Sequence, residues 1–518
     1  MKLHSLFRPK CLFFAAFSFV AVHSVLASKP NIILILADDM GLGDVSGYGT
    51  GGSIKTPNLD KLASEGRRFL DAHTPSGVCT PTRYGLLTGR YAWRTRLKAG
   101  VLQGYSSPLI APGRETVASL LRAEGYATAI IGKWHLGLGW QKKDGTPLAD
   151  AKGHGTPKDI DITLPITAGP TTVGFDRWFG CSASWDMPPY GWFENNRLAR
   201  ASHFVTATKQ QGWKTRPGLR DPEVELADAL PEFAKRARKD ILSFAAGDKP
   251  FFLYIPLTSP HSPVVPNKPF QGKTSIGSYG DFVVETDWVV GQVMQAVDDA
   301  KIKNTTLFLF TTDNGAAQFS RKSEGGKTHL SSGPYRGRKR DNWEGGHRVP
   351  FIARWPGVVK PRSVSRTVIC LTDLTRTLVA AAGGRITRDD VAEDSFNFLP
   401  ALKGDAPGTT IRESTVHHGS RGEFAIRVGH WVYLHHQGSG GNSYPQDKLG
   451  AWEHPGQLYD LQKDPGQTTN LYAKEPKRVK SMSAALVKII LQGRSFPGSP
   501  QKNDPVHIWK KVKGWADF

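Results

Sequence analysis

Four short, almost wholly apolar runs constrain the fold of this chain more than any other feature. Apolar runs of this length are typical of strands buried on both faces, since a strand with one wet face alternates with polar residues. Such strands form a mostly parallel sheet that helices cover on both sides. We therefore predict an α/β fold with a large mixed, mostly parallel sheet built on NIILILA (31–37), YATAIIG (126–132), PFFLYIPL (250–257) and TTLFLFTT (305–312).

Amphipathic helices flanking the sheet are expected between these strands. In TPNLDKLASEG (56–66), Thr56 is a suitable N-cap, Pro57 fits the first turn and Gly66 ends the helix. Further helices are predicted at 114–125 and 371–383, which repeat this scheme, and at 281–300, where the amphipathic pattern is longer.

The sequence changes character at about residue 405. Beyond this point we predict two strand regions, the loop that joins them and a final helix, at 424–436, 456–462, 437–450 and about 475–492. The chain therefore divides into a large domain at 28–404 and a smaller C-terminal antiparallel α+β domain at 405–518.

The N-terminal residues have the pattern of a secretory signal peptide, which we assign to 1–27. Lys2, Arg8 and Lys10 precede an apolar run that is too short to span a bilayer, and small residues follow at the cleavage position. Cys11 has no lipobox context, so lipid attachment is not expected, and no later stretch approaches the length of a membrane span. We expect export to the periplasm or secretion.

The chain is strongly basic, with a formal net charge of +21. Removing a signal that carries three basic and no acidic residues leaves +18. Such a surface either keeps the protein dispersed or attracts a polyanion. No zinc-finger, RNP or helix-turn-helix pattern is present, so no nucleic-acid partner is expected.

Three cysteines remain after cleavage, which is too few for a disulfide scaffold. An odd number in an oxidising compartment leaves at least one thiol unpaired. Cys181 and Cys370 either pair or are buried as small apolar residues. Of the three, Cys79 is the cysteine whose neighbouring residues suggest a chemical role.

Polar residues that follow the predicted strands are the candidates for a site, because ligands bind at the carboxyl ends of strands in open α/β sheets. Asp38 and Asp39 follow the first strand, and Asp313 and Asn314 follow the fourth. Their oxygens suit a hard cation such as calcium or magnesium. Either pair alone is equally compatible with ordinary turn chemistry.

Basic residues follow the other two strands. Lys133 and His135 are two residues apart and face the same side if the strand continues. His261 stands between prolines in SPHSP, where a rigid extended loop fixes its side chain. Each is compatible with a structural role when taken alone.

Cys79 lies at the start of a predicted short helix, PTRYGLLTG (81–89), with Thr80 as N-cap. An anion is favoured at this position, and Arg83 adds a charge suited to an oxyanion. A thiol here is expected to have a lowered pKa and to be a nucleophile. A buried structural cysteine is the alternative.

Together these residues resemble the type I, formylglycine-dependent sulfatases, which are arylsulfatase-like members of the alkaline-phosphatase-like superfamily. CTPTR followed by YGLLTGR matches their signature C-x-P-x-R…L-T-G-R, with Thr82 where many members have serine. Further matches follow in the family's order and span nearly the whole mature chain: ADDMG, GKWHLG, SPHSP, TTDNG, KRDNWEGGHRVPF and QLYDLQKDPGQTTNL. The resemblance implies a sulfuric ester hydrolase whose catalytic domain is 28–404.

The resemblance implies a modified residue and a metal. A formylglycine-generating or equivalent maturation enzyme would oxidise Cys79 to formylglycine, whose hydrate attacks the sulfur atom. One calcium ion would be bound by an oxygen of the modified residue 79 together with Asp38, Asp39, Asp313 and Asn314.

The resemblance also implies roles for the basic residues. The cations that hold the hydrate and the sulfate oxygens would be Arg83, Lys133 and Lys339. His261 would protonate the leaving alcohol, and His135 would take a proton from the second hydroxyl. Ser184 matches the family's sulfate-proximal serine. Cations and calcium aimed at sulfate oxygens stabilise the charge that spreads over them in the transition state.

A sulfated carbohydrate is the expected substrate, because the chain is basic and carries two aromatic stretches, 91–98 and 185–193. Aromatic faces stack on sugar rings, although these aromatics are otherwise core residues. The candidates for reading the sugar are Asp186, Arg94, Arg321, Lys322, His417 and His418.

Three other functions remain open at this point. A phosphate or phosphonate monoesterase would share the same sheet and metal site. An inactive exported polysaccharide-binding protein would keep the basic pocket without the modification. A thiol hydrolase would use Cys79 with His135 or His261.

Overall fold

The computed structural model describes residues 29–504, apart from 51, 151–152, 208–214, 319, 324, 405–409 and 442–449. The predicted signal peptide (1–27), the predicted domain boundary at 405 and most of the predicted loop at 437–450 lie outside the described residues.

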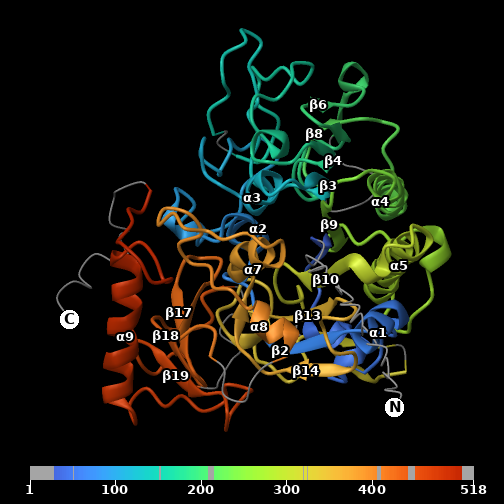
Figure 1. Cartoon of the computed structure of the whole chain (residues 1–518). Helices are drawn as coiled ribbons and strands as arrows, with labels where there is room; N and C mark the ends of the chain where they lie inside the picture. Colours follow the sequence, from blue (N-terminus) through green and yellow to red (C-terminus); the bar gives the residue numbers. More distant parts are fainter. Residues whose placement is uncertain are drawn as a thin grey trace, which may run out of the picture.

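The four apolar runs form adjacent strands at the centre of the large sheet (Figure 1). With one further strand they make five parallel neighbours in the order β10 (Thr306–Thr312), β1 (Asn31–Asp38), β9 (Phe251–Pro260), β3 (Ala127–Lys133) and β4 (Arg177–Cys181). The predicted mixed, mostly parallel sheet is therefore confirmed.

The edges of this sheet make it mixed. Next to β10, β13 (Arg348–Arg354) runs antiparallel and is followed by β2 (Arg67–His73). The sheet has 11 strands among the described residues, and the remaining four are β14 (Ser363–Ser365), β15 (Ile369–Cys370), β5 (Phe193–Glu194) and β6 (Arg197–Leu198).

Both faces of the central strands are buried under helices. In β1, Leu34 packs into one apolar core and Ile35 into the other, as their alternation requires. The core on the Leu34 face includes α2 (Cys79–Thr88), α3 (Val117–Ala123), α7 (Leu374–Ala381) and α8 (Leu399–Lys403). The Ile35 face is covered by α1 (Pro57–Ser64), α4 (Ala229–Ala245) and α5 (Ser278–Asp299). Figure 1 shows these two groups on opposite sides of the strands.

The predicted helices are present, with differences at their ends. Helix α1 begins after Thr56 as predicted, but the Thr56 hydroxyl accepts from the backbone N–H of Ser46 instead of capping the helix. Helix α3 does have a capping box, in which Thr116 and Ser119 bond each other's backbone N–H groups.

The C-terminal region forms its own antiparallel sheet, which confirms that prediction. It consists of β16 (Ser414–His418), β17 (Phe424–Val428), β18 (Trp431–Leu434), β19 (Gln457–Asp460) and the helix α9 (Pro476–Leu491) (Figure 1). The strand predicted at 424–436 is a hairpin instead, because the chain turns at Gly429, whose φ is +59°. Strand β16 was not predicted.

The aromatic stretch 91–98 joins the two domains, so its predicted role in reading a sugar is wrong. Tyr91 and Trp93 are buried in one core with residues of β17 and α9. Arg94 is fully buried and bonds both oxygens of Asp394, each at 2.8 Å. These side chains therefore stabilise the domain interface.

No disulfide joins Cys181 and Cys370. Cys181 ends β4 on one side of the sheet, whereas Cys370 lies in β15 near its other edge, and both are buried free thiols. The alternative that both are small core residues is confirmed.

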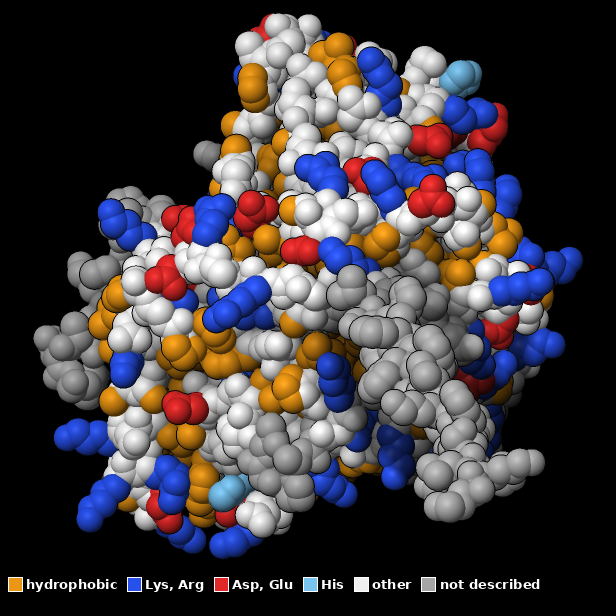
Figure 2. Space-filling view, viewed as in Figure 1, with side chains coloured by type: hydrophobic (Ala, Val, Ile, Leu, Met, Phe, Trp, Pro, Cys, Tyr) orange, Lys and Arg blue, Asp and Glu red, His pale blue; other side chains and the backbone are white. Residues whose placement is uncertain are grey.

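None of the helices in the described part of the chain combines the length and apolarity needed to cross a membrane. On the face seen in Figure 2, Lys and Arg side chains are scattered among neutral and apolar ones.

Candidate active site

The polar residues predicted at the strand ends converge in the folded chain. Asp38 ends β1 and Asp313 follows β10, which pairs with β1, while Lys133 ends β3 and His261 follows β9. Because these strands are parallel neighbours, their carboxyl ends place all four side chains in one region.

Two buried carboxylates at the centre of this region are held by buried cations. Lys133 Nζ lies 2.5 Å from Asp38 Oδ2. The Arg83 guanidinium donates through Nε and Nη2 to Asp313 Oδ2, at 3.0 and 2.7 Å, and its Nη2 lies 3.5 Å from Asp38 Oδ2. Arg83 also donates to the backbone carbonyl of Lys133. The Arg83 guanidinium is therefore held by three groups, which are Asp313, Asp38 and the Lys133 carbonyl.

Asp39 is the third carboxylate. Lys339 Nζ lies 2.6 and 2.7 Å from its two oxygens, Asn314 Nδ2 donates to it at 2.7 Å, and His261 Nε2 is 3.7 Å away. The backbone of Asp39 has φ +68° and that of His135 has φ +58°. Left-handed conformations of this kind are strained in residues with a side chain and concentrate at functional sites.

Burial and neighbouring charges shift the pKa values of these acids in opposite directions. Burial alone would raise the pKa of Asp38, but Lys133, His261, Arg83 and Lys339 hold it well below its usual range. Burial, followed by the Asp38 charge, raises the pKa of Asp313 to about 7. A further positive charge between these two carboxylates would favour their ionised forms.

Cys79 is the first residue of α2, with Val78 as N-cap, so the helix begins earlier than predicted. The Thr80 hydroxyl accepts from the Leu102 N–H instead of capping the helix. Burial raises the pKa of the Cys79 thiol, and Lys133 and Lys339 offset this only in part. The prediction that a plain thiol here has a lowered pKa is therefore wrong.

The two site histidines differ in their hydrogen bonds. His135 Nε2 lies 2.8 Å from Leu102 O, and since a carbonyl only accepts, Nε2 carries the proton. His135 Nδ1 is then an acceptor, and it is buried with no partner in the described chain. Burial and the charges of Lys133 and Arg83 keep the pKa of His135 well below its usual value. His135 is therefore a neutral imidazole with a free lone pair.

His261 donates from Nδ1 to the Ser262 carbonyl at 2.5 Å, which leaves Nε2 directed toward Asp39. Burial and Lys339 lower the pKa of His261, while Asp39 opposes this.

The site described above borders a pocket of about 590 Å³. Cys79, Asp39, His261 and Lys339 lie on its lining, as does the predicted sugar-reading residue Asp186. Its other polar lining residues were not predicted, and they include Arg216, Arg338, Arg340, Ser420 and Arg421. Two of them flank Lys339 in the run R-K-R, a signal that was present in the sequence.

Several predicted residues are placed elsewhere. Ser184 is buried behind the pocket lining, and its hydroxyl has no hydrogen-bond partner within the described ranges. Arg321 stacks over the Tyr279 ring at 3.5 Å, and neither it nor Lys322 lines the pocket. His418 is also buried outside the lining. The predicted role of Arg321, Lys322 and His418 as sugar readers is not supported by their positions.

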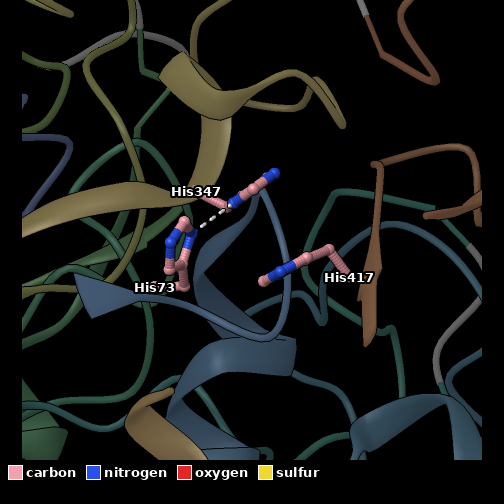
Figure 3. A group of neighbouring side chains, drawn as sticks. All are labelled: His73, His347 and His417. Atoms are coloured by element: carbon pink, nitrogen blue, oxygen red, sulfur yellow. Dashed lines mark hydrogen bonds between the residues drawn. The ribbon is translucent and has the colours of Figure 1, made fainter. Parts of the chain in front are cut away.

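His417 belongs to a buried histidine trio instead of a sugar site (Figure 3). His73 Nδ1 lies 3.1 Å from His347 Nδ1, and the rings of His347 and His417 stack with centroids 3.9 Å apart. The three come from β2, α6 (Glu344–His347) and β16, so the trio links the C-terminal sheet to the large one.

An acidic cluster balanced by buried cations, opening into a basic pocket, suits a metal ion and an anionic substrate. Comparison with known proteins specifies the class. The model of the Sulfatase family matches residues 30–384. The chain therefore belongs to the sulfatase family and is a sulfuric ester hydrolase.

Its relatives are similar over most of their lengths. The chain is 33% identical to N-acetylgalactosamine-6-O-sulfatase of Bacteroides thetaiotaomicron over 498 residues, covering 89% of this chain and 93% of that protein. It is 35% identical to human arylsulfatase A over 489 residues, covering 89% and 86%. A solved structure described with the metabolism of multiple glycosaminoglycans by Bacteroides thetaiotaomicron aligns with a TM-score of 0.78 and 30% identity, covering 89% and 99%.

Proposed function

We propose that this chain is an exported enzyme that removes sulfate from a sulfated carbohydrate, using a formylglycine made from Cys79 and one calcium ion. The observation that carries the proposal is the position of Cys79, which lies on the pocket lining beside Lys339 and His261. The relative that acts on N-acetylgalactosamine-6-O-sulfate supports a sugar substrate. Export is supported by the signal pattern of 1–27.

The residues present fit a calcium ion. Asp38 Oδ1 and Asn314 Oδ1 are buried oxygens without a hydrogen-bond partner in the described chain. Asp38, Asp39, Asp313 and Asn314 form the all-oxygen set that calcium prefers. When bound, the ion would neutralise the acids and polarise a sulfate oxygen.

The cations of the site would bind the sulfate group. Lys339 lies on the pocket lining, and Lys133 and Arg83 lie behind it against the carboxylates. Fixed positive charges in a water-poor site stabilise negative charge that develops on the oxygens during transfer. The modified residue 79 would supply the hydroxyl nucleophile, which an ordinary buried thiol does not.

Proton transfer would be divided between the two histidines. His135 offers the free lone pair of Nδ1 and takes a proton from residue 79. His261 gives a proton from Nε2 to the leaving sugar oxygen. Its pKa is lowered without substrate, so the approach of the sulfate charge would favour its protonated, acid form.

Mass analysis and substrate comparison test the proposal. The full chain is produced in a host with and without a formylglycine-generating enzyme, and the peptide that contains residue 79 is weighed. We expect the aldehyde form and sulfate release together, and neither in Cys79→Ala. The matched aryl phosphate should be a far poorer substrate than the aryl sulfate. Faster phosphate turnover would favour a phosphate monoesterase, and an unmodified Cys79 with full activity would refute the formylglycine.

A further inference from the structure

The pocket wall carries three arginines that the proposed chemistry does not use, Arg338, Arg340 and Arg421. The other two basic lining residues already face acids. Lys339 pairs with Asp39, and Arg216 lies 3.4 Å from an oxygen of Asp186. Arg338 and Arg340 therefore give this side of the pocket a positive charge beyond what the sulfate site requires.

Arg338 and Arg340 have no carboxylate as an ion-pair partner among the described residues. Arg338 is half-buried, and Arg340 is exposed on the pocket wall. Of the residues near them, Asp341 bonds the backbone N–H of Arg338 and not its guanidinium. Their positive charges are thus available to a ligand in the pocket.

The backbone at Arg340 is fixed in an unusual conformation. Its φ is +84°, in the left-handed region that side-chain-bearing residues rarely adopt. Its N–H donates to the Gly77 carbonyl at 2.6 Å, and its carbonyl accepts from the Ser420 N–H at 2.9 Å. The bond to Gly77 ties Arg340 to the segment just before Cys79, so the backbone that carries the Arg340 side chain has a defined position relative to the reaction site.

Glycine at position 77 makes this close approach possible. A Cβ there would lie 2.7 Å from the Asp341 carbonyl oxygen and 3.2 Å from the Arg340 nitrogen. A side chain would therefore push the Arg340 segment away from the entrance of α2. The local sequence is built to keep a strained arginine beside the nucleophile.

We infer that Arg340 and Arg338 form a second anion-binding subsite for a carboxylate or sulfate group of the same saccharide, other than the ester that is cleaved. A guanidinium offers parallel donors that match the paired oxygens of both groups. The substrate class is then a polyanionic saccharide instead of a sugar with a single charge. This inference rests on the proposed function, because it deepens the specificity of the same pocket.

Scattered surface charge of the kind seen in Figure 2 does not account for this specificity. Lys and Arg are scattered on the face in Figure 2, whereas the pocket gathers arginines from two distant segments, 338–340 and 421. Scattered charges attract any polyanion and are screened by salt. Arginines that converge on one pocket instead recognise a group at a defined distance from the cleaved ester.

Steady-state kinetics on matched substrates test the inference. The substrates are an aryl sulfate, a monosulfated N-acetylhexosamine, the same sugar linked to a uronate, and a disulfated form. We expect Arg340→Ala and Arg338→Ala each to raise KM for the last two by about tenfold, the loss expected for one charged hydrogen bond. Their kcat values, and both constants for the aryl sulfate, should stay unchanged. The uronate and disulfated arms show which anion the subsite takes.

Controls keep this test decisive. Arg385→Ala removes an exposed arginine that does not line the pocket and should change no constant. Arg340→Lys keeps the charge but not the paired donors. Its KM for the uronate-linked and disulfated substrates should therefore lie between those of the wild type and Arg340→Ala. Arg338→Ala serves if Arg340→Ala unfolds, and binding of the same saccharides to Cys79→Ala gives a readout without turnover.

Two outcomes separate the inference from the proposed function. If wild-type enzyme cleaves the aryl sulfate but its preference for polyanionic saccharides is the same in Arg338→Ala and Arg340→Ala, the subsite is refuted. If the modified wild-type enzyme cleaves no sulfate ester at all, the proposed function fails first.

Discussion

The buried ion pair of Arg94 and Asp394 gives a quantitative test of the assignment of Arg94 to the domain interface. We propose Arg94→Met, which keeps much of the side-chain volume and removes the charge. In the folded chain Arg94 bonds both oxygens of Asp394, and it also donates to the Ile489 carbonyl of α9 at 3.2 Å. Both side chains of the pair are fully buried.

The cost follows from what Arg94→Met leaves behind. Asp394 would keep only weaker partners, such as the Tyr91 N–H at 2.9 Å, while its charge stays buried. Removing one partner of a buried pair costs roughly 3–5 kcal/mol of unfolding free energy. The midpoint of thermal unfolding should therefore fall by about 3–5 °C, because the unfolding entropy of a chain of this length is on the order of 1 kcal/mol per kelvin. The double variant Arg94→Met/Asp394→Leu removes both charges and should recover most of this loss.

The loss of stability in Arg94→Met should depend on pH in a predictable direction. Burial raises the pKa of Asp394, but Arg94 and its hydrogen bonds lower it below the usual value in the native chain. The pair therefore contributes stability above the pKa of an unfolded aspartate, and this stability is lost as the pH falls. Without Arg94 the carboxyl prefers its neutral form, so the deficit of Arg94→Met should shrink in acid.

The assay pairs thermal unfolding at several pH values with sulfatase kinetics at 25 °C. We expect lower stability and unchanged KM for both aryl and saccharide substrates. If Arg94→Met kept the wild-type midpoint but raised KM for the saccharide alone, Arg94 would read the sugar and the interface assignment would be wrong.

Three further predictions concern the site and the histidine trio. A calcium chelator should lower both activity and unfolding temperature, and added calcium at about 100 times its Kd should restore roughly 2.7 kcal/mol, but not in Asp38→Asn. Alkylation should leave the matured enzyme active, because formylglycine has no thiol; inactivation would instead support a Cys79 nucleophile. Burial lowers the pKa of His347 to about 3 and also lowers that of His417. Below about pH 6.5 the free energy of unfolding should therefore fall by about 1.4 kcal/mol per pH unit for each of these two histidines. When the free energy of unfolding is measured with urea at several pH values, His347→Gln should show a weaker dependence on pH than the wild type.

The central sheet could be predicted because each of its strands carries its own signal. A run such as 31–37 has no polar face, so only burial on both sides accommodates it. Strand β16 has no such signal, since its residues include His417 and His418, which are buried only because of what packs against them. The turn at Gly429 was not predicted, because residues 424–436 follow an apparently continuous strand pattern.

The same contrast divides the site. Asp38, Asp313 and Lys133 were predictable, because the topology of a parallel sheet collects whatever follows its strands. Arg216 and Arg421 were not, since they reach the pocket from loops whose positions depend on tertiary packing. Arg94 shows the opposite error, where an aromatic and basic stretch looked like a sugar surface but is enclosed by the second domain.

The surroundings of Cys79 explain why a bare thiol is a poor match for this site. Burial raises the pKa of the thiol, Lys133 and Lys339 lower it in part, and Asp313 and Asp38 add a smaller upward effect. These same acids are the oxygen donors that fit a cation. A thiolate would therefore have to form beside negative charge in a buried place. An uncharged aldehyde hydrate would avoid that conflict, because under the proposed function it would need no ionisation before a proton passes to His135. Burial, more than the acidic cluster, therefore disfavours a thiolate at this position, and this is compatible with the proposed modification of Cys79.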